Sequence, residues 1–531
     1  MKKHLLLYLS CLALTATHSF AQTPDNPLFR NIPPDATTVY QINLPVITTQ
    51  ISWQELMETM PPSNLVSGDP SAATLLRDPA LAGIDIGKDI FIAVKNPGFD
   101  SAGYTTVIVH LLDSAKFRAA LRKEEAGLRV YSIPNKNKIR LAGKGKLGAA
   151  WSKGLAVLVL VKAPLKEGRE SKTTPPDYAS GAAKRGLAAI QGFDGSFYTT
   201  DPVFQAGFSD GAAVNIWAEQ GQAFSMLGKN PLMAKSPIAR YFQTGAKILK
   251  SNTLTAIRLE PGRITMSSNT VATPVLKALY AKLNSRPLNM DLQSRIPPGN
   301  LLALINLRFD PLMFKDILPQ GGGLHHKIDS FMTAKGLPLD TLLHAFSGDF
   351  QVVCMEPHLS AENGKPKFPL YFVTTIGDPA AFYKLATTVK AISDSAGTDS
   401  ATGKRRSPLA NLKSSSTLQD NILVISGSKE QSNGWFSNTE KRNTDFLTDR
   451  MKDNPFSILI DFKTLTHFVE SMSKGKEPAG KDKKILSILH GIDQLEITGG
   501  AMRNDKVESF FELKLTDSSP NSIRNFIKGL R

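Results

Sequence analysis

A proline-led stretch near the start of the chain, IPPDATTVYQIN at residues 32–43, returns as IPPGNLLALIN at residues 296–306. In both copies, Ile-Pro-Pro leads into an apolar run that closes on Ile-Asn. The offset is 264 residues at the first prolines (297 − 33) and 263 at the asparagines (306 − 43). Proline removes a ladder donor and holds the preceding residue extended, so each copy predicts the opening of a β-strand. The return predicts a chain made of two similar halves.

Two further landmarks recur in the same order. The segment 83–89 leads into an expected strand at 90–94, as the segment 347–349 leads into an expected strand at 350–354. Asp113 with Phe117, and Asp378 with Phe382, share a spacing of four residues, and each aspartate predicts the N-cap of a helix. This repeated order predicts an internal duplication, with a first half at 22–290 and a second half at 291–531.

The pattern of elements predicts an α+β fold of two tandem homologous halves, each mainly antiparallel β-sheet with a few packed helices. Strand pairs are expected at 253–266 and 494–515. The segments with helical patterns are 53–60, 115–125, 274–283 and 522–530. The polar stretches 168–181 and 393–407 are predicted to be loops.

The N-terminus carries the features of a secretory signal peptide. Lys2 and Lys3 are followed by an apolar run at 5–16 and a small-residue cleavage site, Ser19-Phe20-Ala21. We expect residues 1–21 to be removed and the mature protein to be periplasmic, extracellular or associated with the outer membrane. No later run reaches about 18 apolar residues, so no transmembrane segment is expected in the mature chain.

The cysteines exclude an intramolecular disulfide in that mature chain. Cys11 lies inside the signal, and the bulky Tyr8 before it makes a poor lipidation sequence. Cys354 is the only other cysteine and lies in the apolar stretch 350–354, which predicts a buried core thiol.

The chain is basic, with a formal net charge of +16, or +14 once the two signal lysines are removed (16 − 2). The excess lies in three stretches that are predicted to be solvated loops, 162–185, 404–406 and 474–484. Such stretches attract anionic lipid or glycan. None is interleaved with aromatic residues as a single-strand groove requires, so no nucleic-acid partner is expected.

Several catalytic motifs occur in the wrong context. Gly207-Phe208-Ser209-Asp210-Gly211 fits a nucleophile elbow, which needs a strand before Ser209 and a helix after it. Here an apolar, strand-like run follows at 212–217. The glycines of 143–148 fit a dinucleotide loop but lie between two strand-like runs, which predicts a hairpin tip. Ser471 and Lys474 fit a Ser-x-x-Lys pattern without its companion motifs.

Metal and cofactor signals are equally incomplete. The adjacent His325 and His326 follow three glycines, with no second metal-ligand motif. The sequence therefore predicts no catalytic, cofactor-binding or metal residues.

Three segments carry a resemblance to a known family. They are Ile-Pro-Pro-x-Ala at 32–36, GIDIGKDI at 83–90 and DGAAVNIW at 210–217. With these segments the chain resembles a family of exported proteins from Bacteroidota-type bacteria, described as a domain of unknown function. Members of that family are often lipoproteins, whereas Cys11 lacks a good lipidation sequence. The resemblance implies no activity and no site residues.

Together these features predict an exported, non-catalytic protein of the cell envelope that acts as a binding or scaffolding module. The expected partner is another envelope protein or an anionic glycan. The alternatives are a protein of the membrane surface that uses the basic loops and, less favoured, a serine hydrolase that uses Ser209.

Overall fold

The computed structural model describes residues 26–59, 78–98, 101–124, 129–132, 139–144, 146–164, 178–208, 211–219, 251–283, 288–313, 315, 329–330, 333–334, 336–359, 364, 366–395, 415–437, 442–472 and 481–529. Two compact units divide the chain. Unit 1 comprises Met1–Asn230 and Asn252–Leu259, and unit 2 comprises Pro231–Ser251 and Glu260–Arg531. Both contain helices and antiparallel sheet, so the predicted α+β class is confirmed. Among the described helices, none is long and apolar enough to cross a membrane.

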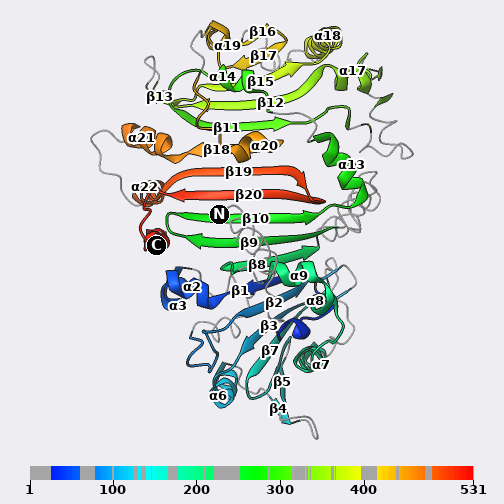
Figure 1. The fold of residues 1–531 in the computed structure, drawn as a ribbon, viewed down its shortest axis with the longest axis vertical. Helices are drawn as coiled ribbons and strands as arrows, with labels where there is room; N and C mark the ends of the chain where they lie inside the picture. The colour runs from blue at the N-terminus through cyan, green and yellow to red at the C-terminus, as the bar shows by residue number, and fades with distance from the viewer. Residues whose placement is uncertain are drawn as a thin grey trace, which may run out of the picture. The chain divides into compact units, whose positions relative to one another are not determined.

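Unit 1 is organised around an antiparallel sheet. Its strands are β1 (Thr38–Ile42), β2 (Ile90–Lys95), β3 (Gly103–His110), β4 (Arg129–Ser132), β5 (Arg140–Lys144), β6 (Leu147–Trp151), β7 (Leu155–Lys162), β8 (Val214–Glu219) and β9 (Asn252–Glu260). Their spatial order is β9-β8-β1-β2-β3-β7-β6-β5-β4, as Figure 1 shows.

Both faces of the unit 1 sheet are buried. The helices are η1 (Phe29–Asn31), α2 (Leu44–Gln50), α3 (Trp53–Thr59), α6 (Ser114–Glu124), α7 (Tyr178–Gln191), α8 (Phe197–Thr200) and α9 (Pro202–Gly207). Successive side chains of a strand point to opposite faces. Phe91 therefore packs in one core with η1, α7, α8 and α9, whereas its neighbour Ile92 packs in another core with α2 and α6.

Unit 2 is also built on antiparallel strands. Its strands are β10 (Arg263–Val271), β11 (Leu301–Arg308), β12 (Phe346–Met355), β15 (Leu370–Ile376), β16 (Ser416–Gln419), β17 (Ile422–Ser426), β18 (Phe456–Asp461), β19 (Ile492–Arg503) and β20 (Lys506–Leu515), beside a separate pair, β13 (His358–Leu359) and β14 (Pro366–Lys367). The spatial order of the main sheet is β10-β20-β19-β18-β11-β12-β15-β17-β16.

The described helices of unit 2 are α13 (Pro274–Leu283), α14 (Met290–Ser294), α17 (Leu339–His344), α18 (Pro379–Ser395), α19 (Lys429–Ser437), α20 (Asp449–Asp453), α21 (Phe462–Met472), α22 (Lys481–His490) and α23 (Ser522–Gly529). Three of the unit 2 helices, α14, α19 and α20, contribute to a core with the strands of this unit. Leu292 of α14, Trp435 of α19 and Met451 of α20 meet the strand residues Leu304 and Val353 in that core.

The two units share one strand order over seven strands. In unit 1 the order is β9-β8-β1-β2-β3-β7-β6, and in unit 2 it is β19-β18-β11-β12-β15-β17-β16. Beyond these strands, unit 1 adds β5 and β4, whereas unit 2 adds β20 and β10. An internal duplication would leave this arrangement, and the duplication itself stays a prediction.

The two predicted N-caps are confirmed. Asp113 Oδ1 accepts hydrogen bonds from the backbone N–H groups of Ala115 (2.8 Å) and Lys116 (3.0 Å) at the start of α6. Asp378 Oδ1 does the same for Ala380 (2.8 Å) and Ala381 (3.3 Å) at the start of α18. These bonds lower the pKa of the Asp113 carboxylate.

The loop predictions are wrong where a helix lies inside them. From Tyr178 onward the stretch 162–185 forms part of α7, residues 481–484 begin α22, and residues 393–395 end α18. Alanine favours helix, and Ala182 and Ala189 of α7 are fully buried against the sheet. The loop prediction rested on the charge of the stretch, which does not report this packing against the sheet. Residues 404–406 lie outside the described part of the chain.

Two smaller differences concern single residues. Helix α2 was not predicted; the side chain of Asn43 caps it by accepting a hydrogen bond from the Val46 N–H (3.2 Å). Cys354 lies in β12 as expected, but its thiol is half-buried, not fully buried. That partial burial raises the pKa of the thiol.

Candidate functional site

The motif residues fall largely outside the described residues. Ser209, Asp210, His325 and His326 are among those not described. The elements around Ser209 are helix α9 before it and strand β8 after it, the reverse of a nucleophile elbow.

The other two motif predictions concern glycines and metal ligands. The segment 143–148 spans the antiparallel hairpin of β5 and β6, which confirms the predicted hairpin. Within the described ranges, no group of His, Cys, Asp and Glu side chains could hold a metal ion.

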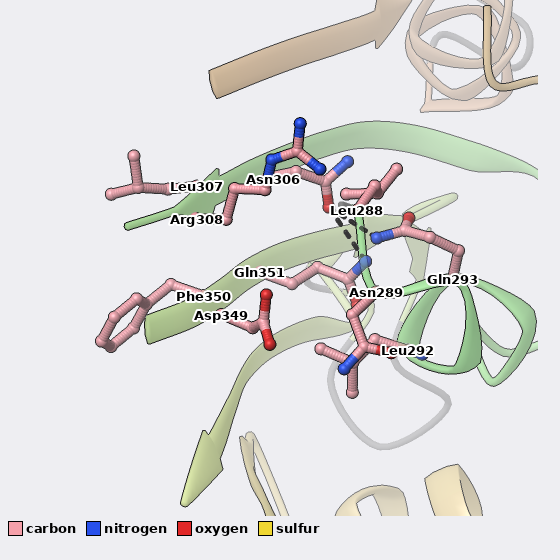
Figure 2. A pocket seen from close by; sticks show the side chains of 10 residues that line it. All are labelled: Leu288, Asn289, Leu292, Gln293, Asn306, Leu307, Arg308, Asp349, Phe350 and Gln351. Carbon is pink, nitrogen blue, oxygen red and sulfur yellow. Dashed lines mark hydrogen bonds between the residues drawn. The ribbon is translucent and has the colours of Figure 1, made fainter. Parts of the chain in front are cut away.

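The strongest candidate site is a pocket in unit 2, beside the end of β11 (Figure 2). Strands β11 and β12 form one side, and α14 with the two residues before it forms the other. The pocket is small: its cavity volume is about 10 Å³, and the space between its lining residues reaches about 210 Å³ only when open solvent is included. It is lined by Leu288, Asn289, Leu292, Gln293, Asn306, Leu307, Arg308, Asp349, Phe350 and Gln351.

A buried amide network forms one wall of this pocket. Asn306 Oδ1 accepts hydrogen bonds from Gln293 Nε2 (3.0 Å) and Gln351 Nε2 (3.1 Å), as Figure 2 shows. The Asn306 amide nitrogen donates to Ser457 Oγ (3.3 Å). Because both glutamines donate to the same oxygen, Oε1 of Gln293 and Oε1 of Gln351 are buried with no hydrogen-bond partner.

Arg308, the last residue of β11, is the cation that lines the pocket. Its side chain is 5% exposed, and its backbone N–H donates to the Pro455 carbonyl (2.8 Å). The side-chain nitrogens Nε and Nη1 are buried and have no hydrogen-bond partner. Burial lowers the pKa of the guanidinium, and the carboxylates of Asp349 and Asp453 act in the opposite direction.

Asp349 is the carboxylate that lines the pocket. It lies directly opposite Arg308 on β12, and Thr375 Oγ1 donates a hydrogen bond to its Oδ2 (3.2 Å). The two side chains do not form a hydrogen bond through Nε or Nη1 of Arg308. The pocket therefore holds a buried cation whose partner is missing from the described residues.

A second charged cluster, in unit 1, is fully paired. Asp35, from the repeated Ile-Pro-Pro stretch, accepts hydrogen bonds from Lys95 Nζ (2.8 Å) and from the Tyr104 hydroxyl. The Arg185 guanidinium lies over the Tyr104 ring at 4.7 Å. Burial raises the pKa of Asp35, but the bonds from Lys95 and Tyr104 outweigh it, and the pKa is lowered overall. This cluster is a structural ion pair.

Sequence reasoning missed the unit 2 pocket, although one signal was present. In the run LLALINLR at 301–308, the alternation that buries Leu304 places Asn306 and Arg308 on the same face. Polar residues at inward positions of a strand need buried partners. That signal points to a polar site, but the partners come from α14 and β12, which the sequence does not connect to β11.

Comparison with protein families and with curated proteins finds no match. Two solved structures, crystal forms IV and III of a protein designated TP0453, share 9% and 8% sequence identity with this chain. They cover 50% and 49% of this chain and 88% of their own, each with a TM-score of 0.28. Similarity at this level carries no argument about fold or function.

Proposed function

We propose that the protein is an exported, non-catalytic binding module of the cell envelope, and that unit 2 holds a small anionic group at Arg308. One observation carries the proposal: a guanidinium that is 5% exposed, with two nitrogens lacking a hydrogen-bond partner. A buried charge without a partner costs several kcal/mol, and an anion bound beside it would offset that cost.

The composition of the pocket favours binding over chemistry. Its only carboxylate is Asp349, and its other polar side chains are amides and Arg308. General acid–base catalysis commonly uses two titratable groups with separated pKa values. Amides and a guanidinium orient and hold a ligand without taking part in proton transfer at neutral pH.

The test is isothermal titration calorimetry of the mature chain from Gln22 onward with acetate, propionate, lactate, alanine, phosphate and sulfate. We expect at least one of them to bind, and Arg308→Met to weaken that binding about 10- to 100-fold, since charge-assisted hydrogen bonds contribute about 1.5–3 kcal/mol. The matched control is Arg295→Met, which removes a cation paired with Asp291 outside the pocket (2.9 Å).

Absence of binding by all six compounds in the millimolar range would contradict the proposal. So would binding that Arg308→Met and Arg295→Met reduce equally, because a general charge effect would then explain it.

A second candidate function is contact with an anionic membrane surface. Three aromatic side chains of unit 2 are exposed, Phe368, Phe372 and Tyr383, and the whole chain has a net charge of +16. Such side chains enter the boundary between lipid headgroups and acyl chains. Co-sedimentation with liposomes that responds to neither anionic lipid content nor salt would exclude this candidate.

A further inference from the structure

We infer that unit 1 carries an anion site of its own, formed by three arginines, and that this site binds a phosphate group. The arginines are Arg118 and Arg122 of α6 and Arg140 of β5. The site lies in unit 1 and shares no residue with the pocket proposed for unit 2.

The fold of unit 1 places the three side chains beside one another. Arg118 and Arg122 are four residues apart on α6, so their side chains are neighbours on the helix surface. Arg140 lies two residues before Ala142 on β5, and both therefore point to the same face of the sheet. That face is the one on which α6 packs, because Ala142 shares a core with Phe117 of α6. The three cations thus gather at the contact between α6 and β5.

The three charges repel one another. The pKa of Arg118 is lowered, mainly by the positive charge of Arg122, then by partial burial and by the charge of Arg140. In the described part of the chain, no ion pair joins any of the three to a carboxylate. Nε of Arg118 is buried, so the stem of this side chain lies against the protein and holds the charge near its neighbours. An anion bound among the three guanidinium groups would replace this repulsion by attraction.

Unit 2 indicates that the fold does not require the arginine pair on α6. Helix α18 begins as α6 does, with an N-cap aspartate 265 residues further along the chain (378 − 113). At the same offset, the neutral Tyr383 and Thr387 of α18 take the places of Arg118 and Arg122.

The helix dipole does not account for the cluster either. A cation is stabilised near the C-terminus of a helix, but only within the last turn, where Arg122 lies. Arg118 lies in the middle of α6, and Arg140 lies on a strand. Like charges four residues apart destabilise a helix by themselves, so the cluster points to an anionic ligand.

The chemistry of the three side chains favours phosphate over a carboxylate. A guanidinium group is always charged, and its planar fork of N–H donors matches the oxygens of a phosphate. A phosphate monoester carries about −1.5 to −2 charge at neutral pH and three acceptor oxygens. A carboxylate offers one charge and two oxygens to the same three cations. Phosphate groups occur on lipid headgroups and on soluble molecules, so both sources are tested.

The first measurement is isothermal titration calorimetry of the mature chain from Gln22 onward with inorganic phosphate. We expect binding that weakens as salt is raised. The double variant Arg118→Gln/Arg140→Gln should weaken it about tenfold or more, since charge-assisted hydrogen bonds are lost. The matched control, Arg30→Gln/Lys184→Gln, removes two exposed cations from η1 and α7, on the other face of the sheet, and should leave binding nearly unchanged.

Co-sedimentation with phosphatidylcholine vesicles, with and without phosphatidic acid, tests the lipid source. Sedimentation that needs both phosphatidic acid and the arginines would support a lipid phosphate, and arginine-dependent binding of inorganic phosphate without sedimentation would support a soluble one. Circular dichroism shows whether the double variant is folded. Arg122→Gln, at an exposed position, is a second variant that should weaken binding in the same assays.

Three results would overturn the inference. The first is no binding of inorganic phosphate together with no sedimentation on phosphatidic acid. The second is equal weakening by the arginine variants and by Arg30→Gln/Lys184→Gln. The third is phosphate binding that Arg308→Met abolishes and the arginine variants keep, which would place the anion in unit 2 and leave the proposed function standing. Binding that depends on Arg118 and Arg140 but not on Arg308 supports the unit 1 site whether or not the function proposed for unit 2 holds.

Discussion

Units 1 and 2 share a strand order but bury one face of the sheet to different extents. In unit 1 a cross-strand row of Ile92, Val107 and Leu158 is fully buried under α2 and α6. The row at the same place in unit 2 is Val352, Phe372 and Ile425. Val107 is 3% exposed, whereas Phe372 is 49% exposed and both of its neighbours are half-buried. Strand order thus places a residue in a row, but the segments packed on the sheet decide its burial.

The two units also differ in how well a charged side chain is paired. Asp35 in unit 1 has a cation and a hydroxyl as partners, although its side chain is 42% exposed. Arg308 in unit 2 is far more buried and has two nitrogens without a partner. The less buried charge is therefore the better paired one. A fold selected for stability alone would reverse this, which is why the unpaired Arg308 points to a ligand.

The largest expected effect comes from placing a charge in each row. Val107→Asp buries a carboxylate between β2 and β7 and should destabilise the protein by more than about 3 kcal/mol or prevent folding. Phe372→Asp should cost no more than about 1 kcal/mol, since half of that side chain is already in water. Urea unfolding followed by circular dichroism measures both. Equal costs would show that the unit 2 row is covered as well as the unit 1 row.

The next largest effect on stability is expected from substitutions in the buried amide networks of the two units. Asn306→Leu removes the partner of Gln293 and Gln351 and should lower the free energy of unfolding by about 2–3 kcal/mol. In unit 1, Gln41 accepts from Asn215 Nδ2 (3.1 Å) and donates to Asp89 (2.7 Å). Gln41→Leu should cost less, about 1–2 kcal/mol, because Asp89 is half-buried and can bond to water. A larger loss at Gln41 would contradict the importance given to the unit 2 network.

Arg308→Met should raise the free energy of unfolding of the ligand-free protein by about 1–2 kcal/mol, since replacing an uncompensated buried charge by an apolar side chain is neutral or stabilising. Arg295→Met, the ion-paired and half-buried control, should change it by no more than about 0.5 kcal/mol. A clear loss of stability in Arg308→Met would indicate that the guanidinium has a structural partner, and would weaken the case for a ligand.

The smallest effect concerns pH and the paired charge in unit 1. The folded pKa of Asp35 is below its ordinary value, so its stabilising contribution is present above that ordinary value and is lost as pH falls through the lowered pKa. The stability difference between the unaltered chain and Asp35→Asn should therefore be constant near neutral pH and shrink in acid. A difference that is the same at pH 7 and in strong acid would show that the carboxylate charge contributes nothing.

Much of the secondary structure followed from the sequence, because its signals are local. Asp113 and Asp378 were predicted as N-caps from a side chain and the helical pattern just after it, and both form the bonds. The strand pair at 494–515 and the helix at 274–283 were predicted on equally local grounds. The charged stretch 162–185 misled because the helix within it is stabilised by contacts with the sheet.

The repeated Ile-Asn shows where local similarity ends. Asn43 closes β1 and caps α2, whereas β11 continues through Asn306 to Arg308. The same dipeptide thus ends a strand in one unit and forms the centre of a buried network in the other. By itself the sequence determined most of the strands, the caps at Asp113 and Asp378 and the repeated order of landmarks, which depend on residues adjacent in the chain. Only the tertiary structure brought Gln293 and Gln351 to Asn306 and left Arg308 without a partner, because those contacts join segments that lie 13 and 45 residues from Asn306 and are selected by packing.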